Sequence, residues 1–73
     1  MNYTPKEIGK LIKDTRKSIG ITQKALALTA GTGKRFIIEL EKGKDTSQLG
    51  KVLIVLQTLG IKITFTMPQG IDQ

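Results

Sequence analysis

The sequence predicts a small all-α domain of four helices, followed by a single C-terminal β-strand. Apolar residues recur at helical spacing in four runs, and a glycine ends each run. Residues 61–67 instead alternate apolar and polar side chains, which is typical of a strand. The 73 residues suffice for one domain, which we expect to span residues 1–68, with a flexible tail over residues 69–73.

The first helix is expected to cover residues 5–19. Thr4 can cap its N-terminus, Pro5 suits the first helical position, and Glu7 can return a hydrogen bond to the cap amide. Gly20 follows the run, where a left-handed residue often ends a helix. The side chains predicted to share its buried face are Ile8, Leu11, Ile12, Thr15 and Ile19.

Two short helices are expected over residues 23–30 and 33–42, with Thr22 and Thr32 as their N-caps. Between them, Gly31 can adopt the positive φ that a sharp turn needs. Two short helices joined in this way form a helix-turn-helix motif. The residues predicted to hold the two helices together are Ala27, Ile37 and Leu40.

The fourth helix is expected over residues 47–59, with Thr46 or Ser47 as its cap and Gly60 after its end. Its predicted apolar stripe consists of Leu49, Val52, Leu53, Leu56 and Leu59.

The predicted strand has no partner within a helical domain, and its backbone groups need one. We therefore expect antiparallel pairing with the same strand of a second copy, across a two-fold axis. An irregular apolar tail packed on the fourth helix is the alternative. The residues expected at the dimer contact are Ile61, Ile63, Phe65 and Met67.

The charge balance points to a polyanionic partner. Twelve Lys and Arg residues outweigh six Asp and Glu, which gives a net charge of +6 and a pI near 9.9. Nucleic acid is the first candidate, an anionic membrane surface the second, and a merely Lys-rich soluble domain the third. A stripe of lysines on the first helix is interpreted as solvated surface; it comprises Lys6, Lys10, Lys13 and Lys17.

The composition disfavours an enzyme. The chain has no His and no Cys, so the usual general base and thiol nucleophile are missing, and its acids form no metal-ligand cluster. We expect no catalytic residue, no cofactor and no metal. With no long apolar run and no secretory signal, the sequence also indicates no membrane contact and a cytoplasmic protein.

The stretch GITQKALALTAGTGKRFIIELEKGK, followed by TSQLGKVLIVLQTLGI, resembles the Cro/phage-repressor (XRE-type) helix-turn-helix family. The resemblance implies a lambda-repressor-like DNA-binding domain of four to five helices, with its motif over residues 23–42. Ala30 departs from the family pattern, which usually has a larger aliphatic residue there. The matching positions are Gln23, Ala27, Gly31, Ile37, Leu40 and the Leu-Glu-Lys-Gly ending at Gly43.

The resemblance implies base contacts from Lys34 and Arg35, because Arg can donate two hydrogen bonds to guanine. Contact with phosphate or solvent alone is the alternative. Glu39 matches another base-contacting position, where it could accept from cytosine N4 or be repelled by phosphates. Ile38 is a candidate to meet a thymine methyl group, and so is Phe36, for which core packing is favoured.

Other positions are implied in contacts with the DNA backbone. Gln23 is expected to bind a phosphate beside the positive helix terminus, with a plain helix-start role as the alternative. Thr32 and Gly33 are expected to let the main chain approach the groove. Arg16 and Glu41 are expected to form a partly buried ion pair between the first and third helices. The expected phosphate contacts of the loop are Lys42, Lys44, Thr46 and Ser47.

The stretch KVLIVLQTLGIKITFT is most similar to one branch of the family, the HipB-type antitoxins. That resemblance implies a homodimer on a palindromic operator in double-stranded DNA, which represses its own operon in the bacterial nucleoid and binds a HipA-type kinase toxin. The alternatives are a stand-alone phage-type repressor, a restriction-modification controller, or a toxin-neutralising interaction module with secondary DNA binding. A basic amphipathic protein of membrane surfaces is the remaining alternative.

Overall fold

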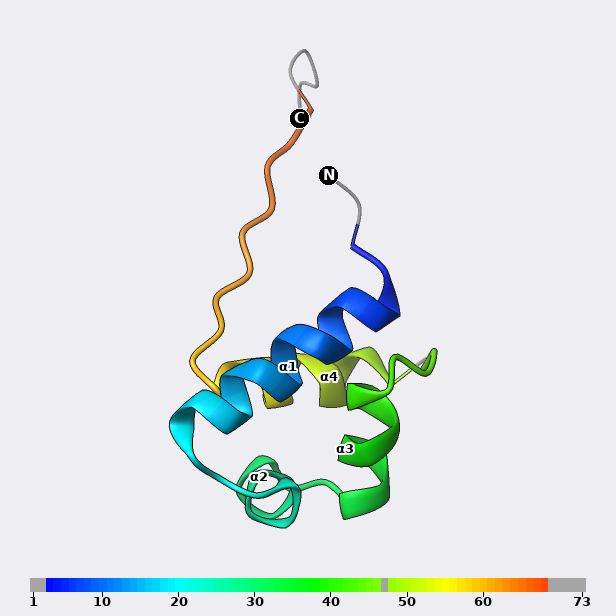
Figure 1. Cartoon of the computed structure of the whole chain (residues 1–73). Coiled ribbons are helices and arrows are strands. Elements are labelled where there is room, and N and C mark those ends of the chain that lie inside the picture. Colours follow the sequence, from blue (N-terminus) through cyan, green and yellow to red (C-terminus); the bar gives the residue numbers. More distant parts are fainter. Residues whose placement is uncertain (1–2, 47, 69–73) are drawn as a thin grey trace.

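The computed structural model describes residues 3–46 and 48–68 and contains four helices. They are α1 (Pro5–Ile19), α2 (Gln23–Ala30), α3 (Lys34–Glu41) and α4 (Leu49–Thr58). α3 packs against both α1 and α2, and α4 packs against α2 (Figure 1). The helical prediction is confirmed. None of the described helices is long and apolar enough to cross a membrane.

The first two helices begin at the predicted caps. The Thr4 amide donates to Glu7 Oε1 at 2.9 Å, and the Glu7 amide donates to Thr4 Oγ1 at 3.2 Å, so the capping box is complete. Thr22 Oγ1 accepts from the Ala25 amide at 3.0 Å. These bonds satisfy amides that have no partner inside a helix.

The last two helices begin later than predicted. Gly33, not Thr32, is the N-cap of α3, and the Thr32 hydroxyl instead donates to the Gly33 carbonyl at 3.3 Å. α4 begins at Leu49, because the chain first turns through a bond from the Gln48 amide to Thr46 Oγ1. Ser47, the other predicted cap, and the predicted tail over residues 69–73 lie outside the described residues.

Each helix is followed by a glycine with a positive φ, as predicted, and the next amide bonds to a carbonyl five residues earlier. The glycines are Gly20, Gly31, Gly43 and Gly60.

The core faces of α1 and α4 differ from the predicted apolar stripes. On α1, Leu11 is 44% exposed, because the inward face is centred on Gly9, Ile12 and Arg16 instead. Ile19 of α1 and the α4 residues Leu49 and Leu53 are exposed as well. The buried apolar core is made of Ile12, Leu26, Ala27, Ala30, Ile37, Leu40, Val55, Leu56 and Leu59.

Residues 61–68 run away from the helical body (Figure 1) and form no strand within the described chain. The strand predicted for residues 61–67 is therefore not confirmed, since a strand needs a neighbour and the single chain offers none. The alternative of a tail packed on α4 holds only for its first residue, Ile61, which packs against the core. Beyond it, Ile63 is 44%, Met67 57% and Phe65 87% exposed.

Gly9 allows α1 to cross the end of α3 at close range. A Cβ at this position would lie 3.0 Å from the Glu41 carbonyl oxygen and nearer still to that of Leu40. Both neighbours are main-chain atoms, so neither can turn aside. Any side chain larger than hydrogen must separate the two helices.

We predict that Gly9→Ala lowers the free energy of unfolding by about 2–3 kcal/mol through this overpacking. Gly50→Ala is the matched control, because Gly50 lies inside α4 and a Cβ added there would meet no atom within 4 Å. Its better helix propensity should raise stability by up to about 1 kcal/mol. Urea unfolding followed by circular dichroism measures both, and equal stabilities of the two variants would contradict the packing argument.

Candidate nucleic-acid interface

The turn between α2 and α3 has the geometry that a helix-turn-helix requires. Gly31 adopts φ 73° and ψ 31°, and the Thr32 amide donates to the Ala27 carbonyl across the turn at 2.8 Å. Ala27 is only 3% exposed and Ile37 is fully buried, so the two helices meet through these side chains. The inner half of α3 is thereby fixed, and its outer half is left facing solvent.

The exposed start of α3 is strongly cationic. Lys34 and Arg35 occupy its first turn, and the Arg35 side chain is 88% exposed. No side chain caps this helix, and no acidic residue lies in its first turn. Cations at the positive end of a helix dipole are unfavourable for the helix itself. The same arrangement attracts an anion, which the free amides of the first turn can also bind.

A buried ion pair joins α1 to the end of α3. Arg16 Nε donates to Glu41 Oε2 at 2.6 Å and Arg16 Nη2 donates to Glu41 Oε1 at 3.1 Å. Arg16 Nη1 donates to the Ile21 carbonyl at 2.9 Å, which holds the loop before α2. The hydrogen bond to Glu41 outweighs burial and raises the pKa of Arg16 above its ordinary value, so the guanidinium stays charged. The pair expected from the resemblance is thus present.

Gln23 extends this pair to α2. Its Nε2 donates to Glu41 Oε1 at 3.1 Å, and its side chain is only partly buried. The carboxylate of Glu41 therefore accepts from helices α1 and α2 at once. An amide nitrogen has a second hydrogen, so this contact leaves one Gln23 donor for another acceptor.

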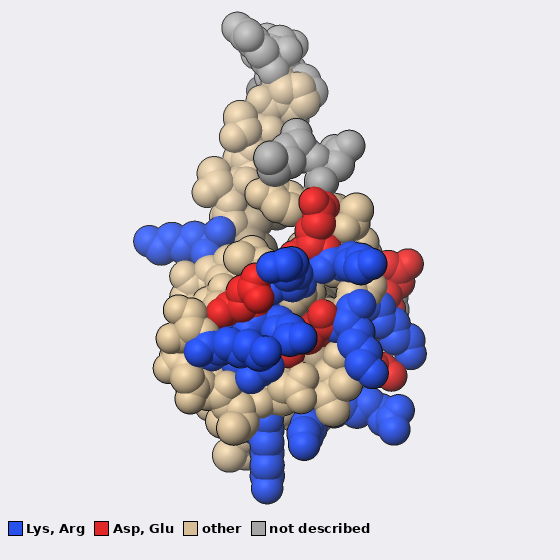
Figure 2. Space-filling model, in the orientation of Figure 1, with Lys and Arg blue, Asp and Glu red and all other residues tan. Residues whose placement is uncertain are grey.

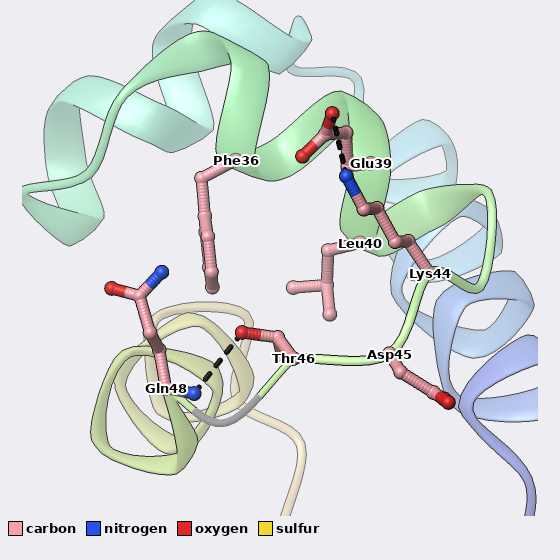
Figure 3. Close-up of a pocket in the computed structure, with 7 residues that line it drawn as sticks. All are labelled: Phe36, Glu39, Leu40, Lys44, Asp45, Thr46 and Gln48. Atoms are coloured by element: carbon pink, nitrogen blue, oxygen red, sulfur yellow. Dashed lines mark hydrogen bonds and ion pairs between the residues drawn. The ribbon is translucent and has the colours of Figure 1, made fainter.

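Two hollows adjoin on the outside of α3, and Glu39 lines both. The first, of about 290 Å³, lies between α3, the following loop and the start of α4 (Figure 3). In it, Lys44 Nζ is 3.3 Å from Glu39 Oε2, and Phe36 points toward α4. The second, of about 410 Å³, is lined by Lys34, Arg35, Ile38, Glu39 and Lys42.

The structure therefore brings most of the predicted contact residues to one side of α3. Gln23 is not among them, because its side chain is directed to Glu41. Thr32 and Gly33 lie just before α3 and line neither of these two hollows. Ser47 is outside the described residues, and Thr46 lines the first hollow. Figure 2 shows Lys and Arg spread over the helical body with acidic side chains between them, whereas the projecting segment is nearly uncharged. Within residues 3–46 and 48–68, no group of His, Cys, Asp or Glu could hold a metal ion.

The helix-turn-helix family model matches residues 12–65, which is most of the 73-residue chain. The chain belongs to the helix-turn-helix family. A related protein agrees: the uncharacterized HTH-type transcriptional regulator y4mF of Sinorhizobium fredii (strain NBRC 101917 / NGR234) is 52% identical over 65 residues. The match covers 89% of this chain and 86% of that protein. We conclude that this helix-turn-helix protein is a DNA-binding transcriptional regulator.

Two solved structures share the fold of this regulator. An MDT protein and a chain of a HipA–HipB–O2–O3 complex each superpose with a TM-score of 0.80 and 26% sequence identity. In both cases the match covers 94% of this chain and 97% of the other. The fold therefore agrees with the resemblance to HipB that the sequence indicated.

Two residues of this helix-turn-helix protein carry roles that the sequence did not reveal. Gly9 lets α1 approach the end of α3 closely, because it has no Cβ to meet the α3 main chain. A glycine in the middle of a predicted helix is a signal in the sequence that could have indicated this close contact. Lys51 of α4 lies with its Nζ 5.6 Å from the Phe36 ring centroid, where it adds a cation beside the first hollow. Its spacing from Phe36 in the sequence offers no such signal.

We predict that Glu41→Ala lowers the free energy of unfolding by about 3 kcal/mol, because it leaves the Arg16 charge buried without its carboxylate. The double substitution Arg16→Met with Glu41→Leu should recover more than half of this loss, since an apolar pair of similar volume has no charge to desolvate. Thermal and urea unfolding measure both. A Glu41→Ala protein as stable as the wild type would show that the pair does not hold α1 on α3.

Proposed function

We propose that this chain is a dimeric repressor that recognises a palindromic operator through the outer face of α3. The observation that carries the proposal is the exposed Arg35 beside Lys34 on a helix whose inner face is fully buried. The contact of Arg35 with Glu39, at 3.8 Å, is exposed, so it is too weak to account for two cations at the positive end of a helix. The major groove of DNA, with its phosphates and guanine acceptors, does account for them.

In this proposal the predicted contact residues other than Glu39 divide into two groups. Arg35 and Lys34 read base edges, and Ile38 offers an apolar contact to a thymine methyl group. Gln23 donates its remaining amide hydrogen to a phosphate, held in place by Glu41. The residues that contact the backbone or let it come close are Thr32, Gly33, Lys42, Lys44, Thr46 and Ser47.

Dimerisation is supported by apolar surface that the single chain leaves exposed. The projecting segment presents Ile63, Phe65 and Met67 to solvent, and its sequence alternates as a strand does. We propose that it pairs with the same segment of a second copy, with Ile61 at its base. Exposed side chains on α4 extend the available contact area; they are Leu49, Leu53 and Ile54. A two-fold dimer matches a palindrome whose half-sites lie about 34 Å apart.

We further propose that the protein is an antitoxin that binds a HipA-type kinase and represses the operon of both, acting at the bacterial nucleoid. The support is the near-complete match to a chain of the HipA–HipB–O2–O3 complex. This likeness favours the antitoxin over a stand-alone repressor.

Selection from a random pool of duplexes at physiological salt tests the DNA-binding proposal. We expect enrichment of a palindrome, with binding that weakens at a log–log salt slope near −7 if each protomer neutralises about four phosphates. Arg35→Ala should cost about 1–3 kcal/mol and relax one base position in each half-site. Failure to enrich any sequence would refute specific recognition, and enrichment of single half-sites would refute the dimer.

Two substitutions separate the dimer from the DNA contact. Ile63→Lys should abolish the preference for the palindrome over an isolated half-site, because it places a charge in the proposed strand contact. Thr64→Lys adds the same charge on the opposite face of the alternating segment and should leave that preference intact. If the two variants kept the same preference for the palindrome, the segment would not be part of the dimer interface.

The antitoxin proposal predicts a stable complex with a kinase-type protein encoded beside this chain. Co-expression of the two, with a tag on the kinase only, should recover both in one peak by size exclusion. The same kinase with a helix-turn-helix protein of unrelated sequence is the control. Separate elution of the two proteins at micromolar concentration would contradict the antitoxin proposal, and the repressor proposal would stand without it.

A further inference from the structure

Glu39 is an acidic residue among several cations on the outside of α3, where Asp45 at the first hollow is a second acid. Its Oε2 lies 3.3 Å from Lys44 Nζ and 3.8 Å from Arg35 Nη1, so one carboxylate oxygen serves two cations. Arg35 belongs to the first turn of α3 and Lys44 to the loop after it. Glu39 is also the residue that lines both hollows on this side of the protein.

These two ion pairs do little to hold the fold together. The Arg35 side chain is 88% and the Lys44 side chain 64% exposed, and exposed pairs contribute little to stability. The arrangement along the helix, with the cation before the acid, is also the weaker orientation for residues four apart. A carboxylate at this place would repel phosphates as well. Because Glu39 adds little to stability and opposes binding to phosphates, we expect its role to lie in the choice among DNA sequences.

We propose that Glu39 is a specificity-determining residue that acts through Arg35 and Lys44 by disfavouring DNA that offers only phosphates. When both cations turn to phosphates, the carboxylate loses its partners and is left beside like charge. When Arg35 binds guanine O6 and N7, two of its five N–H groups are used and others remain for Glu39. The carboxylate then weakens the wrong complex more than the right one, which raises the ratio of affinities.

This inference rests on the proposed function, because it concerns how α3 discriminates among duplexes. Its mechanism differs from direct reading of cytosine N4 by the carboxylate. In direct reading, Glu39 contributes without Arg35. In the mechanism proposed here, its effect on specificity depends on Arg35.

Glu39→Gln tests the inference, because it removes the charge and keeps the shape. The ligands are the duplex that the wild-type protein selects and a scrambled duplex of the same composition. We expect affinity for the scrambled duplex to rise about three- to tenfold, and the selected-to-scrambled ratio to fall by a similar factor.

Asp14→Asn is the matched control. Asp14 pairs with Lys10 at 2.6 Å, also four residues apart on a helix, but on α1. The substitution changes net charge by the same amount, and the affinity ratio should change less than about twofold. A similar fall in the ratio for both variants would assign the effect to net charge and overturn the inference.

Glu39→Gln in an Arg35→Ala background tests whether Glu39 acts through Arg35. We expect Glu39→Gln to change the affinity ratio less than about twofold there, since the arginine through which it acts is gone. An undiminished fall would mean that Glu39 reads a base itself, and an unchanged ratio in the wild-type background would mean that it has no part in specificity. A wild-type protein that selects no sequence would refute the proposed function instead, and that result is obtained first.

Discussion

The buried ion pair between Arg16 and Glu41 is the interaction on which the arrangement of the other helices depends. It connects α1 to the end of α3, and Gln23 and the Ile21 carbonyl connect the same two charges to α2. Buried charged groups need partners in a fixed geometry, whereas buried apolar side chains allow small shifts of one helix against another. With a core of few large side chains, the pair therefore specifies how α3 sits on its neighbours, and hence where its outer face points.

α3 itself combines opposite requirements in eight residues. A helix this short is not stable in isolation, and its cationic, uncapped start makes it less so. Its stability comes from Ile37, Leu40 and Glu41, which are all buried on the inner side. Because tertiary contacts supply the stability, the outer side is free to carry residues that suit a partner rather than the helix.

The sequence predicts this fold well where the signals are local. The caps at Thr4 and Thr22 and the glycine stops depend on neighbouring residues alone, and they are found where expected. The inward face of α1 was predicted only in part: Ile12 is buried as expected and Arg16 was expected there from the family resemblance, whereas Gly9 carries no apolar signal and becomes buried only through α3. The strand could not be settled either, since its pairing would depend on a second chain. On the candidate contact surface, helical periodicity places Arg35 outside, opposite Ile37 and Leu40. Periodicity places Glu39 on the same face as Arg35, four residues away, but it could not find the second partner, Lys44, which comes back toward α3 only after the chain has turned beyond its end.

The base of the projecting segment connects the proposed dimer contact to the DNA-reading surface. The Ile61 amide donates to the Leu56 carbonyl at 2.9 Å and the Ile61 side chain packs on the core, so the segment leaves α4 in a fixed direction. α4 packs on α2, and α2 leads through its turn into α3. In the proposed dimer, pairing of the two segments would therefore set the spacing of the two α3 helices through packed elements, without a flexible linker between them.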